Sequence, residues 1–305
     1  MKPLVTAVLT ALFLACSAIG QTTDKKKNPS PKLPPGTKAL RNLTYAKIGE
    51  RELQLDLYLP EKRTGRLPVI VWVHGGAWLG GSRSNVPARV LAQLARGYAV
   101  ASISYRFSSE AIFPAQIEDC RAAIRWLRAN AATYELDADH IGAWGASAGG
   151  HLVALLGTAA DAREFDKGKY LDQSARVQAV CDFFGPTDFL QMDGPGSKMK
   201  HGGPKSPESL LIGGPVAQHK DKVARANPVT YVSKKSAPFL LVHGEKDPLV
   251  ILGQSKLLRD ALIKVGVEVD LLVVLDGGHG GPGFDAPDIV QRIEDFFDRH
   301  LKPKK

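Results

Sequence analysis

The feature that most constrains the fold is an alternation of strand-like and helix-like segments along residues 40–301. VIVWV (69–73) and AVASISY (99–105) are short apolar runs of the kind that buried parallel strands show. The other expected strands are 53–59, 140–145, 177–184, 239–243 and 269–275, and the expected helices are 85–96, 114–131, 148–157, 254–265 and 286–299. Strands that alternate with helices require a mostly parallel central sheet with helices on both faces, so the sequence predicts an α/β fold.

One domain is expected over residues 39–302, because no change of composition and no internal repeat divides this stretch. Within it, LQLDLYL (53–59) alternates apolar and polar residues, which predicts an edge strand with one face in water. Residues 189–226 are rich in Gly and Pro, and long connections are often lids, so we expect a small loop-rich lid there. Residues 303–305 form a basic tail.

The first 20 residues have the pattern of a signal peptide, with a lysine, an uncharged apolar run and small residues before Gln21. This predicts a secreted or periplasmic protein. The apolar run is short for a membrane span, and no other approaches 18 residues, so no membrane span is expected. A lipid anchor on Cys16 is the weaker alternative, because Phe13 fits that signal poorly. Residues 21–38 are polar and rich in Lys and Pro, which indicates an extended linker.

The net charge of +9 lies mainly at the two ends of the chain. Residues 1–38 carry +5 and residues 302–305 carry +3, which leaves the body near neutrality. A nucleic-acid-binding protein needs a basic face on its folded domain, so nucleic acid is not an expected partner.

Two kinds of site have little support. Cys120 and Cys181 lie in apolar helix-like and strand-like stretches, which favours small core residues over nucleophiles or a disulfide framework. The eight histidines form no clustered ligand pattern such as HExxH, so we expect neither a metal nor another cofactor.

The first chemical motif is GASAG (145–149), a G-x-S-x-G sequence around Ser147. It follows the strand-like HIGAW and precedes the helix-like HLVALL, which is the context of a sharp strand-to-helix turn that exposes a serine hydroxyl. Large side chains two residues to either side would collide with the neighbouring strand and helix.

A second motif, HGGAW (74–78), directly follows a buried strand. We expect the backbone N–H groups of Gly75, Gly76 and Ala148 to form an oxyanion hole. Taken alone, HGG would be read as a tight strand-exit turn.

Two further strand ends supply an acid and a base, Asp247 in HGEKDPLV and His279 in GGHGG. The order Ser147, Asp247, His279 is that of α/β-hydrolases and differs from the orders of chymotrypsin and subtilisin. Because the carboxyl ends of parallel strands meet at one edge of a sheet, we expect these side chains to form a catalytic triad.

These motifs, with FPAQIEDCRAAIRWL (113–127) and DFFGPTDF (182–189), resemble the α/β-hydrolase esterases over about residues 42–300. The resemblance is greatest to bacterial acetyl-xylan and feruloyl esterases, which are related to hormone-sensitive-lipase-like carboxylesterases. The chain departs from that pattern in two ways: Ala77 replaces the third glycine of HGGG, which would narrow the acyl pocket, and the N-terminal helical cap is absent.

The resemblance implies a carboxylesterase that cleaves short acyl or cinnamoyl esters, as small molecules or linked to plant polysaccharide. Two alternatives stay open, a serine peptidase of the prolyl-oligopeptidase type and a non-catalytic binding protein on the same fold. The candidate aromatic residues of the pocket wall are Trp78, Phe113, Phe184 and Phe189.

Overall fold

The structure is a computed structural model that describes residues 31–302. The expected signal peptide, Cys16, residues 21–30 of the expected linker and the tail 303–305 lie outside the described residues. The end of the expected linker belongs to the folded domain, because Leu33 packs against an apolar cluster and the first strand begins at Thr37.

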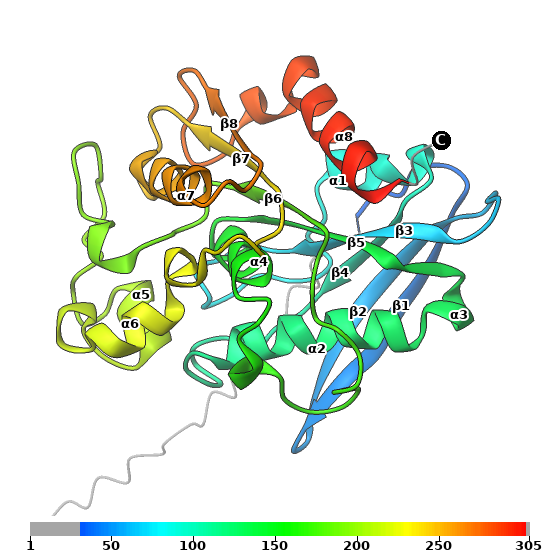
Figure 1. The fold of residues 1–305 in the computed structure, drawn as a ribbon, viewed down its shortest axis with the longest axis horizontal. Coiled ribbons are helices and arrows are strands. Elements are labelled where there is room, and N and C mark those ends of the chain that lie inside the picture. Colours follow the sequence, from blue (N-terminus) through cyan, green and yellow to red (C-terminus); the bar gives the residue numbers. More distant parts are fainter. Residues whose placement is uncertain (1–30, 303–305) are drawn as a thin grey trace, which may run out of the picture.

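Within residues 31–302, eight strands form one sheet in the order β1-β2-β4-β3-β5-β6-β7-β8 (Figure 1). The strands β3 to β8 run parallel to one another, whereas β2 is antiparallel to both β1 and β4. The predicted mostly parallel sheet is therefore confirmed. The bounds are β1 Thr37–Ile48, β2 Arg51–Pro60, β3 Leu67–Val73, β4 Ala99–Ile103, β5 Leu136–Ala146, β6 Ala179–Phe183, β7 Phe239–Gly244 and β8 Val269–Val274.

Helices cover both faces of this sheet, as expected (Figure 1). On one face, α1 and α8 pack in an apolar cluster with Trp72, Trp144 and Phe183 of the sheet. On the other face, α2, α4 and α7 form the larger cluster. These helices span α1 Ala88–Leu91, α2 Ala115–Ala129, α4 Ala148–Thr158, α7 Gly253–Lys264 and α8 Pro287–Leu301, and a short α3 covers Ala131–Tyr134.

The prediction of an edge strand at 53–59 is wrong. This segment lies inside β2, between β1 and β4, and most of its residues are buried on both faces. Its polar residue Asp56 is only 3% exposed, because Arg41 and Arg83 pair with its carboxylate and the backbone N–H of Asn42 donates to it at 2.9 Å. A buried carboxylate with two cations and an amide produces the same alternating pattern as a water-facing strand.

Residues 189–226 do not form a plain loop. They contain the short helices α5 (Pro207–Ile212) and α6 (Lys220–Ala226), together with two 3₁₀ turns. The hydroxyl of Ser206 accepts from the backbone N–H of Ser209 at 3.2 Å and begins α5, and Gly213 ends it in the left-handed region at φ 79°. In Figure 1 this segment lies at one end of the molecule, beside α7. We call residues 189–226 the cover segment.

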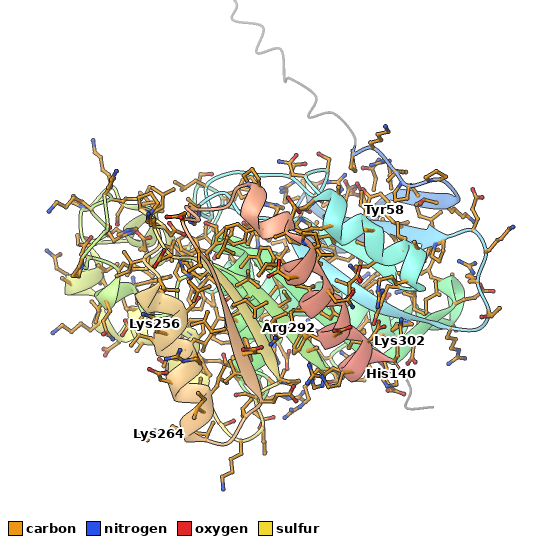
Figure 2. All side chains as sticks on the ribbon, turned by 90° about the horizontal axis from the view of Figure 1, so that it is seen from above. Tyr58, His140, Lys256, Lys264, Arg292 and Lys302 are labelled. Carbon is orange, nitrogen blue, oxygen red and sulfur yellow. The ribbon has the colours of Figure 1, made fainter. Side chains whose placement is uncertain are left out.

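Lys256 and Lys264 on α7 and Arg292 on α8 are exposed (Figure 2). In contrast, Arg121 and Arg125 of α2 are buried. Cys120 and Cys181 are both buried and unpaired, as expected for small core residues. Within residues 31–302, no helix is both long and apolar enough to cross a bilayer.

Candidate active site

Ser147 sits on a sharp turn between β5 and α4, with φ 55° and ψ −122°. An L-residue rarely adopts a positive φ, and such strain is typical of functional turns. The flanking glycines have the predicted role: a Cβ on Gly145 would lie 2.3 Å from the carbonyl oxygen of Gly149, and a Cβ on Gly149 would lie 2.0 Å from that of Val73. The glycines are therefore needed for space at this turn.

The structure brings together the serine, histidine and aspartate that the sequence indicated. The hydroxyl of Ser147 lies 2.9 Å from Nε2 of His279, and Nδ1 of His279 lies 2.7 Å from Oδ2 of Asp247. Asp247 follows β7 and His279 follows β8, so both come from the same edge of the sheet as Ser147. With a proton on Nδ1, His279 donates to Asp247 and accepts from Ser147, as a general base must.

The Asp247 carboxylate is held on both oxygens. Its Oδ1 accepts from the backbone N–H groups of Leu249 and Val250 at 2.9 and 3.0 Å, and its Oδ2 faces His279. Burial raises the pKa of Asp247, but hydrogen bonds from His243 and His279 outweigh it and hold this pKa far below its usual value. The carboxylate therefore stays ionised and can stabilise a charged imidazole.

Two other acids, Glu245 just before Asp247 and Asp276 just before His279 in sequence, face elsewhere. Glu245 accepts from the backbone N–H of Asp276 at 3.3 Å, and Asp276 pairs with Lys246 on the exposed surface. Neither carboxylate bonds to His279, so of these acids Asp247 alone has the position of an orienting acid.

The HGGAW turn packs directly against the Ser147 turn. A Cβ on Gly75 would lie 2.7 Å from the carbonyl oxygen of Ala146 and 3.3 Å from Cβ of Ser147. The carbonyl of Gly76 accepts from the N–H groups of Leu79 and Gly80 at 3.0 and 3.1 Å, so it points back into its own loop. In a trans peptide the N–H points opposite to the carbonyl, so the N–H of the next residue, Ala77, points out of the loop.

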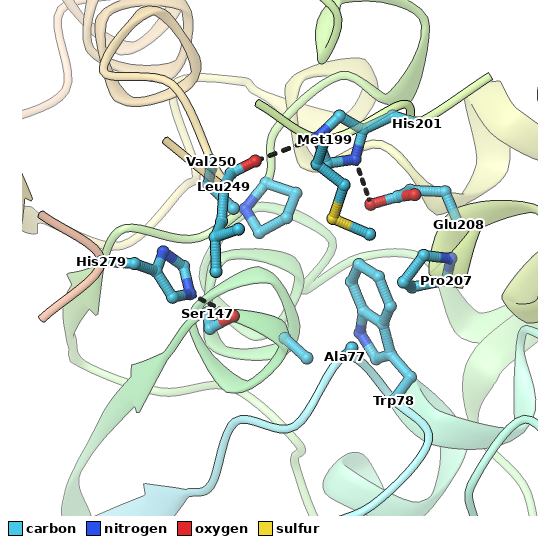
Figure 3. A pocket seen from close by; sticks show the side chains of 12 residues that line it. Ala77, Trp78, Ser147, Met199, His201, Pro207, Glu208, Leu249, Val250 and His279 are labelled. Atoms are coloured by element: carbon cyan, nitrogen blue, oxygen red, sulfur yellow. Dashed lines mark hydrogen bonds and ion pairs between the residues drawn. The ribbon is translucent and has the colours of Figure 1, made fainter. Parts of the chain in front are cut away.

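A cavity of about 70 Å³ lies over Ser147 and His279 (Figure 3). This is small beside the ~300–1,000 Å³ of pockets that take drug-sized ligands. The two strand-end turns contribute Ala77, Trp78 and Ala148 to its wall. The remaining lining residues are Pro186, Met199, His201, Pro207, Glu208, Leu249 and Val250.

The chain matches the BD-FAE family over residues 55–262, which is more than half of its 305 residues. It belongs to the BD-FAE family.

Curated and solved relatives agree with this assignment. Esterase LipQ of Mycobacterium tuberculosis is 31% identical over 234 residues, which are 76% of this chain and 54% of LipQ. A truncated carbohydrate esterase from gut microbiota matches with a TM-score of 0.79 and 33% identity, over 87% of this chain and 97% of that one. A bifunctional GH43-CE protein of Bacteroides eggerthii matches with a TM-score of 0.79 and 36% identity, over 86% of this chain and 35% of that one.

The chain spans about half the length of the curated relatives it matches. Together these matches confirm the relationship to α/β-hydrolase serine esterases that the motifs predicted.

Of the four aromatic residues expected in the pocket wall of this BD-FAE family member, only Trp78 lines the cavity. Phe113 packs against Phe165 in the core, with ring centroids 5.8 Å apart. Phe184 lies 4.6 Å from the ring of His279 and so packs on the imidazole, and Phe189 lies 5.5 Å behind Trp78. Phe184 and Phe189 therefore pack against site residues from outside the cavity, whereas Phe113 belongs to the core.

Of the residues expected to form the oxyanion hole, only one lines the cavity. Ala148 lines the cavity, whereas Gly75 and Gly76 do not, and the neighbouring Ala77 does. From the sequence, Ala77 was expected only to narrow the pocket with its side chain. Its place at the third glycine position of the HGGG pattern is the signal that could have indicated it.

Trp78 is fixed by a residue that the sequence analysis also missed. Its Nε1 donates to Nδ1 of His151 at 3.2 Å, and Nε2 of His151 donates to the carbonyl of Ala226 at 2.7 Å. Burial lowers the pKa of His151 to about 4, so this histidine is neutral near pH 7. It links the HGGAW turn, α4 and the end of the cover segment.

Within the described residues, no group of three or more His, Cys, Asp or Glu side chains is placed to hold a metal ion.

Proposed function

We propose that this protein is a serine carboxylesterase that hydrolyses short-chain acyl esters through Ser147, His279 and Asp247. The observation that carries the proposal is the hydrogen-bonded chain from Ser147 through His279 to Asp247 at the wall of a small cavity. The family and the esterases among its relatives support the same reaction class.

In the proposed reaction the Ser147 oxygen attacks the ester carbonyl carbon while Nε2 of His279 takes the hydroxyl proton. The tetrahedral intermediate then collapses, the bond to the alcohol oxygen breaks, and His279 returns the proton to the leaving alcohol. Water attacks the resulting acyl-enzyme by the same relay and releases the carboxylic acid. The ionised Asp247 stabilises the His279 imidazolium both when the acyl-enzyme forms and when water hydrolyses it.

The negative charge that develops on the carbonyl oxygen needs N–H donors. We propose that Ala148 and the turn Gly75-Gly76-Ala77 supply them, which adds Ala77 to the donors expected from the sequence. Ala148 and Ala77 both line the cavity, and the turn packs against Ser147. The loss of one such donor costs about 3 kcal/mol in the activation barrier.

The size of the cavity supports small acyl groups, and acetyl above the bulkier feruloyl. Relatives described as carbohydrate esterases support an acylated carbohydrate as the substrate class, and plant cell-wall polysaccharide is one source. The apolar run within residues 1–20 supports export to the periplasm or the medium.

The test is hydrolysis of p-nitrophenyl esters by the purified protein and by Ser147→Ala and His279→Ala. Each variant should lower kcat to below about a hundredth of wild type while the circular dichroism spectrum stays unchanged. Ser233→Ala, at an exposed serine, is the matched control and should retain activity. An inactive wild type would favour a binding protein, and cleavage of prolyl peptides in place of esters would favour a peptidase.

A further inference from the structure

The cavity holds a second polar group besides the Ser147–His279 pair. His201 and Glu208, both from the cover segment, line the same cavity and are only 2% and 3% exposed. Figure 3 shows them across the cavity from Ser147 and His279. Their neighbours in the wall are largely apolar, among them Met199, Pro207 and Trp78. A few polar groups in an apolar cavity fix the orientation of what binds there.

The hydrogen bonds of His201 define its charge. Its Nε2 lies 2.9 Å from the carbonyl oxygen of Leu249, which can only accept, so Nε2 carries a proton. Its Nδ1 lies 2.9 Å from Oε1 of Glu208. Burial lowers the pKa of His201, but the hydrogen bond to Glu208 and the charge of that carboxylate outweigh it, so this pKa is raised. The pair is therefore an imidazolium that donates to a carboxylate.

The second oxygen of Glu208 is unsatisfied. Oε2 is buried and has no hydrogen-bond donor among the described residues. A buried carboxylate oxygen without a donor is costly, and native structures seldom leave one without a purpose. Oε2 itself has almost no accessible surface, so the Glu208 carboxylate must turn slightly toward the cavity that this residue lines before a molecule beside Ser147 can supply the donor.

The chemistry of the pair selects the kind of donor. Since imidazolium and carboxylate cancel in charge, the pair offers little attraction to a cation, and a neutral hydroxyl group fits best. One cavity of about 70 Å³ contacts both Ser147 and Glu208, so one small substrate can present its ester to Ser147 and a hydroxyl group to Glu208.

We propose that Glu208, held by His201, accepts a hydrogen bond from a substrate hydroxyl and so selects hydroxylated esters over their deoxy counterparts. This inference rests on the proposed esterase function and specifies its substrate. The hydroxyl can belong to the alcohol part, as in a partly acylated sugar, or to the acyl part, as in a hydroxy acid. The shared chemistry is a neutral hydroxyl donor near the ester bond.

Two pairs of nearly isosteric esters test the proposal. The pair 2-hydroxyethyl acetate and propyl acetate differs in the alcohol part, and the pair methyl glycolate and methyl propanoate differs in the acyl part. For each pair, the ratio of kcat/KM for the hydroxylated ester to that for the deoxy ester is measured in wild type and variant. A loss of folded enzyme cancels in this ratio, and so does the intrinsic reactivity of each ester when variant and wild type are compared.

Glu208→Met removes the acceptor at similar size and should lower the ratio in one of the pairs by about tenfold or more. Glu208→Gln, which keeps an amide oxygen for His201, should lower it less. Glu164→Met, at an exposed glutamate, is the matched control and should leave both ratios as in wild type. The ester pair whose kcat/KM ratio falls shows whether the alcohol part or the acyl part of the substrate carries the hydroxyl.

The inference is overturned if both ratios stay at the wild-type value in Glu208→Met, even when all rates fall together, because Glu208 would then act only in folding. If the wild-type protein cleaves none of the four esters and no p-nitrophenyl ester, the proposed function itself fails.

Discussion

Asp182 leads to a quantitative prediction about the support of the Ser147 turn. It lies in β6 opposite Gly145 and is fully buried. Its Oδ1 accepts from the N–H of Gly185 at 3.0 Å, and its Oδ2 has no partner among the described residues. A Cβ on Gly150, in the first turn of α4, would lie 2.3 Å from Oδ1, so the carboxyl fills the space behind that turn.

Burial raises the pKa of Asp182 from 3.8 to about 7, and the hydrogen bond from Gly185 opposes this only in part. The folded state therefore keeps the proton at pH values where the unfolded chain releases it. Below about pH 4 Asp182 is protonated in both the folded and the unfolded state, so its ionisation does not change the free energy of unfolding. Between about pH 4 and 7 the folded state loses stability as pH rises, and above about pH 7 the loss is constant. The pKa difference of about 3 corresponds to about 4 kcal/mol at 1.36 kcal/mol per pKa unit.

Asp182→Asn is neutral at every pH and retains an oxygen for Gly185. The free energy of unfolding of this variant minus that of wild type should rise by up to about 4 kcal/mol from about pH 4 to about pH 8. Urea unfolding at constant ionic strength, followed by tryptophan fluorescence, measures it. Subtracting wild type removes the contributions of the other titrating groups.

The control is Asp172→Asn, the same substitution at an exposed carboxyl. If the stability difference between Asp182→Asn and wild type stays constant within about 1 kcal/mol over this range, Asp182 does not titrate between the two states as argued.

Three further predictions concern the active site. Asp247→Asn should lower kcat for p-nitrophenyl acetate by about 10⁴, because the amide favours the wrong tautomer of His279, whereas Glu245→Gln should cost less than about tenfold; the reverse order would refute the choice of acid. In a p-nitrophenyl series, kcat/KM should be highest at about C2 to C4 and fall by C8, because the cavity is small; a rise that continues to C10 would indicate a lipase. Gly149→Ala should abolish activity and lower the thermal midpoint, because its Cβ would collide with the carbonyl of Val73, and near-normal kcat would contradict this.

The strands and the meeting of Ser147, Asp247 and His279 could be predicted because their signals are local. Each buried strand is a short apolar run, and Ser147, Asp247 and His279 each lie close after the end of such a run. Parallel strands then place their carboxyl ends at one edge without any knowledge of side-chain contacts. The glycines two residues from Ser147 are local signals of the same kind.

The first strand gave no such signal. In β1 only Tyr45 is fully buried, and its other residues are polar or partly exposed at the edge of the sheet. Edge pairing needs only backbone groups, which every sequence offers. The neighbouring β2 was misread because Asp56 is neutralised by Arg41 and Arg83, which lie 15 and 27 residues away. The alternation of apolar and polar residues along a strand looks the same whether the polar residue is a buried, paired carboxylate or one that faces water.

The cavity wall could not be predicted residue by residue. Composition placed a lid at 189–226, and four of its residues do line the cavity, yet no motif distinguishes Met199, His201 or Glu208 from other residues of the segment. The aromatic candidates failed for the opposite reason. Aromatic residues near the ends of strands pack in the core as readily as in a cavity, and Phe113, Phe184 and Phe189 did so.

Leu249 links the two polar groups of the cavity. Its N–H donates to Oδ1 of Asp247, and its carbonyl accepts from Nε2 of His201. The loop that carries Asp247 and the cover segment that carries Glu208 are therefore joined by hydrogen bonds of the one residue Leu249. A substitution of His201 would release the Leu249 carbonyl and the Glu208 carboxylate together, so it would alter both kcat and selectivity. A substitution of Glu208 leaves the Leu249 bond in place, and for this reason it is the variant that isolates selectivity from the chemistry of the triad.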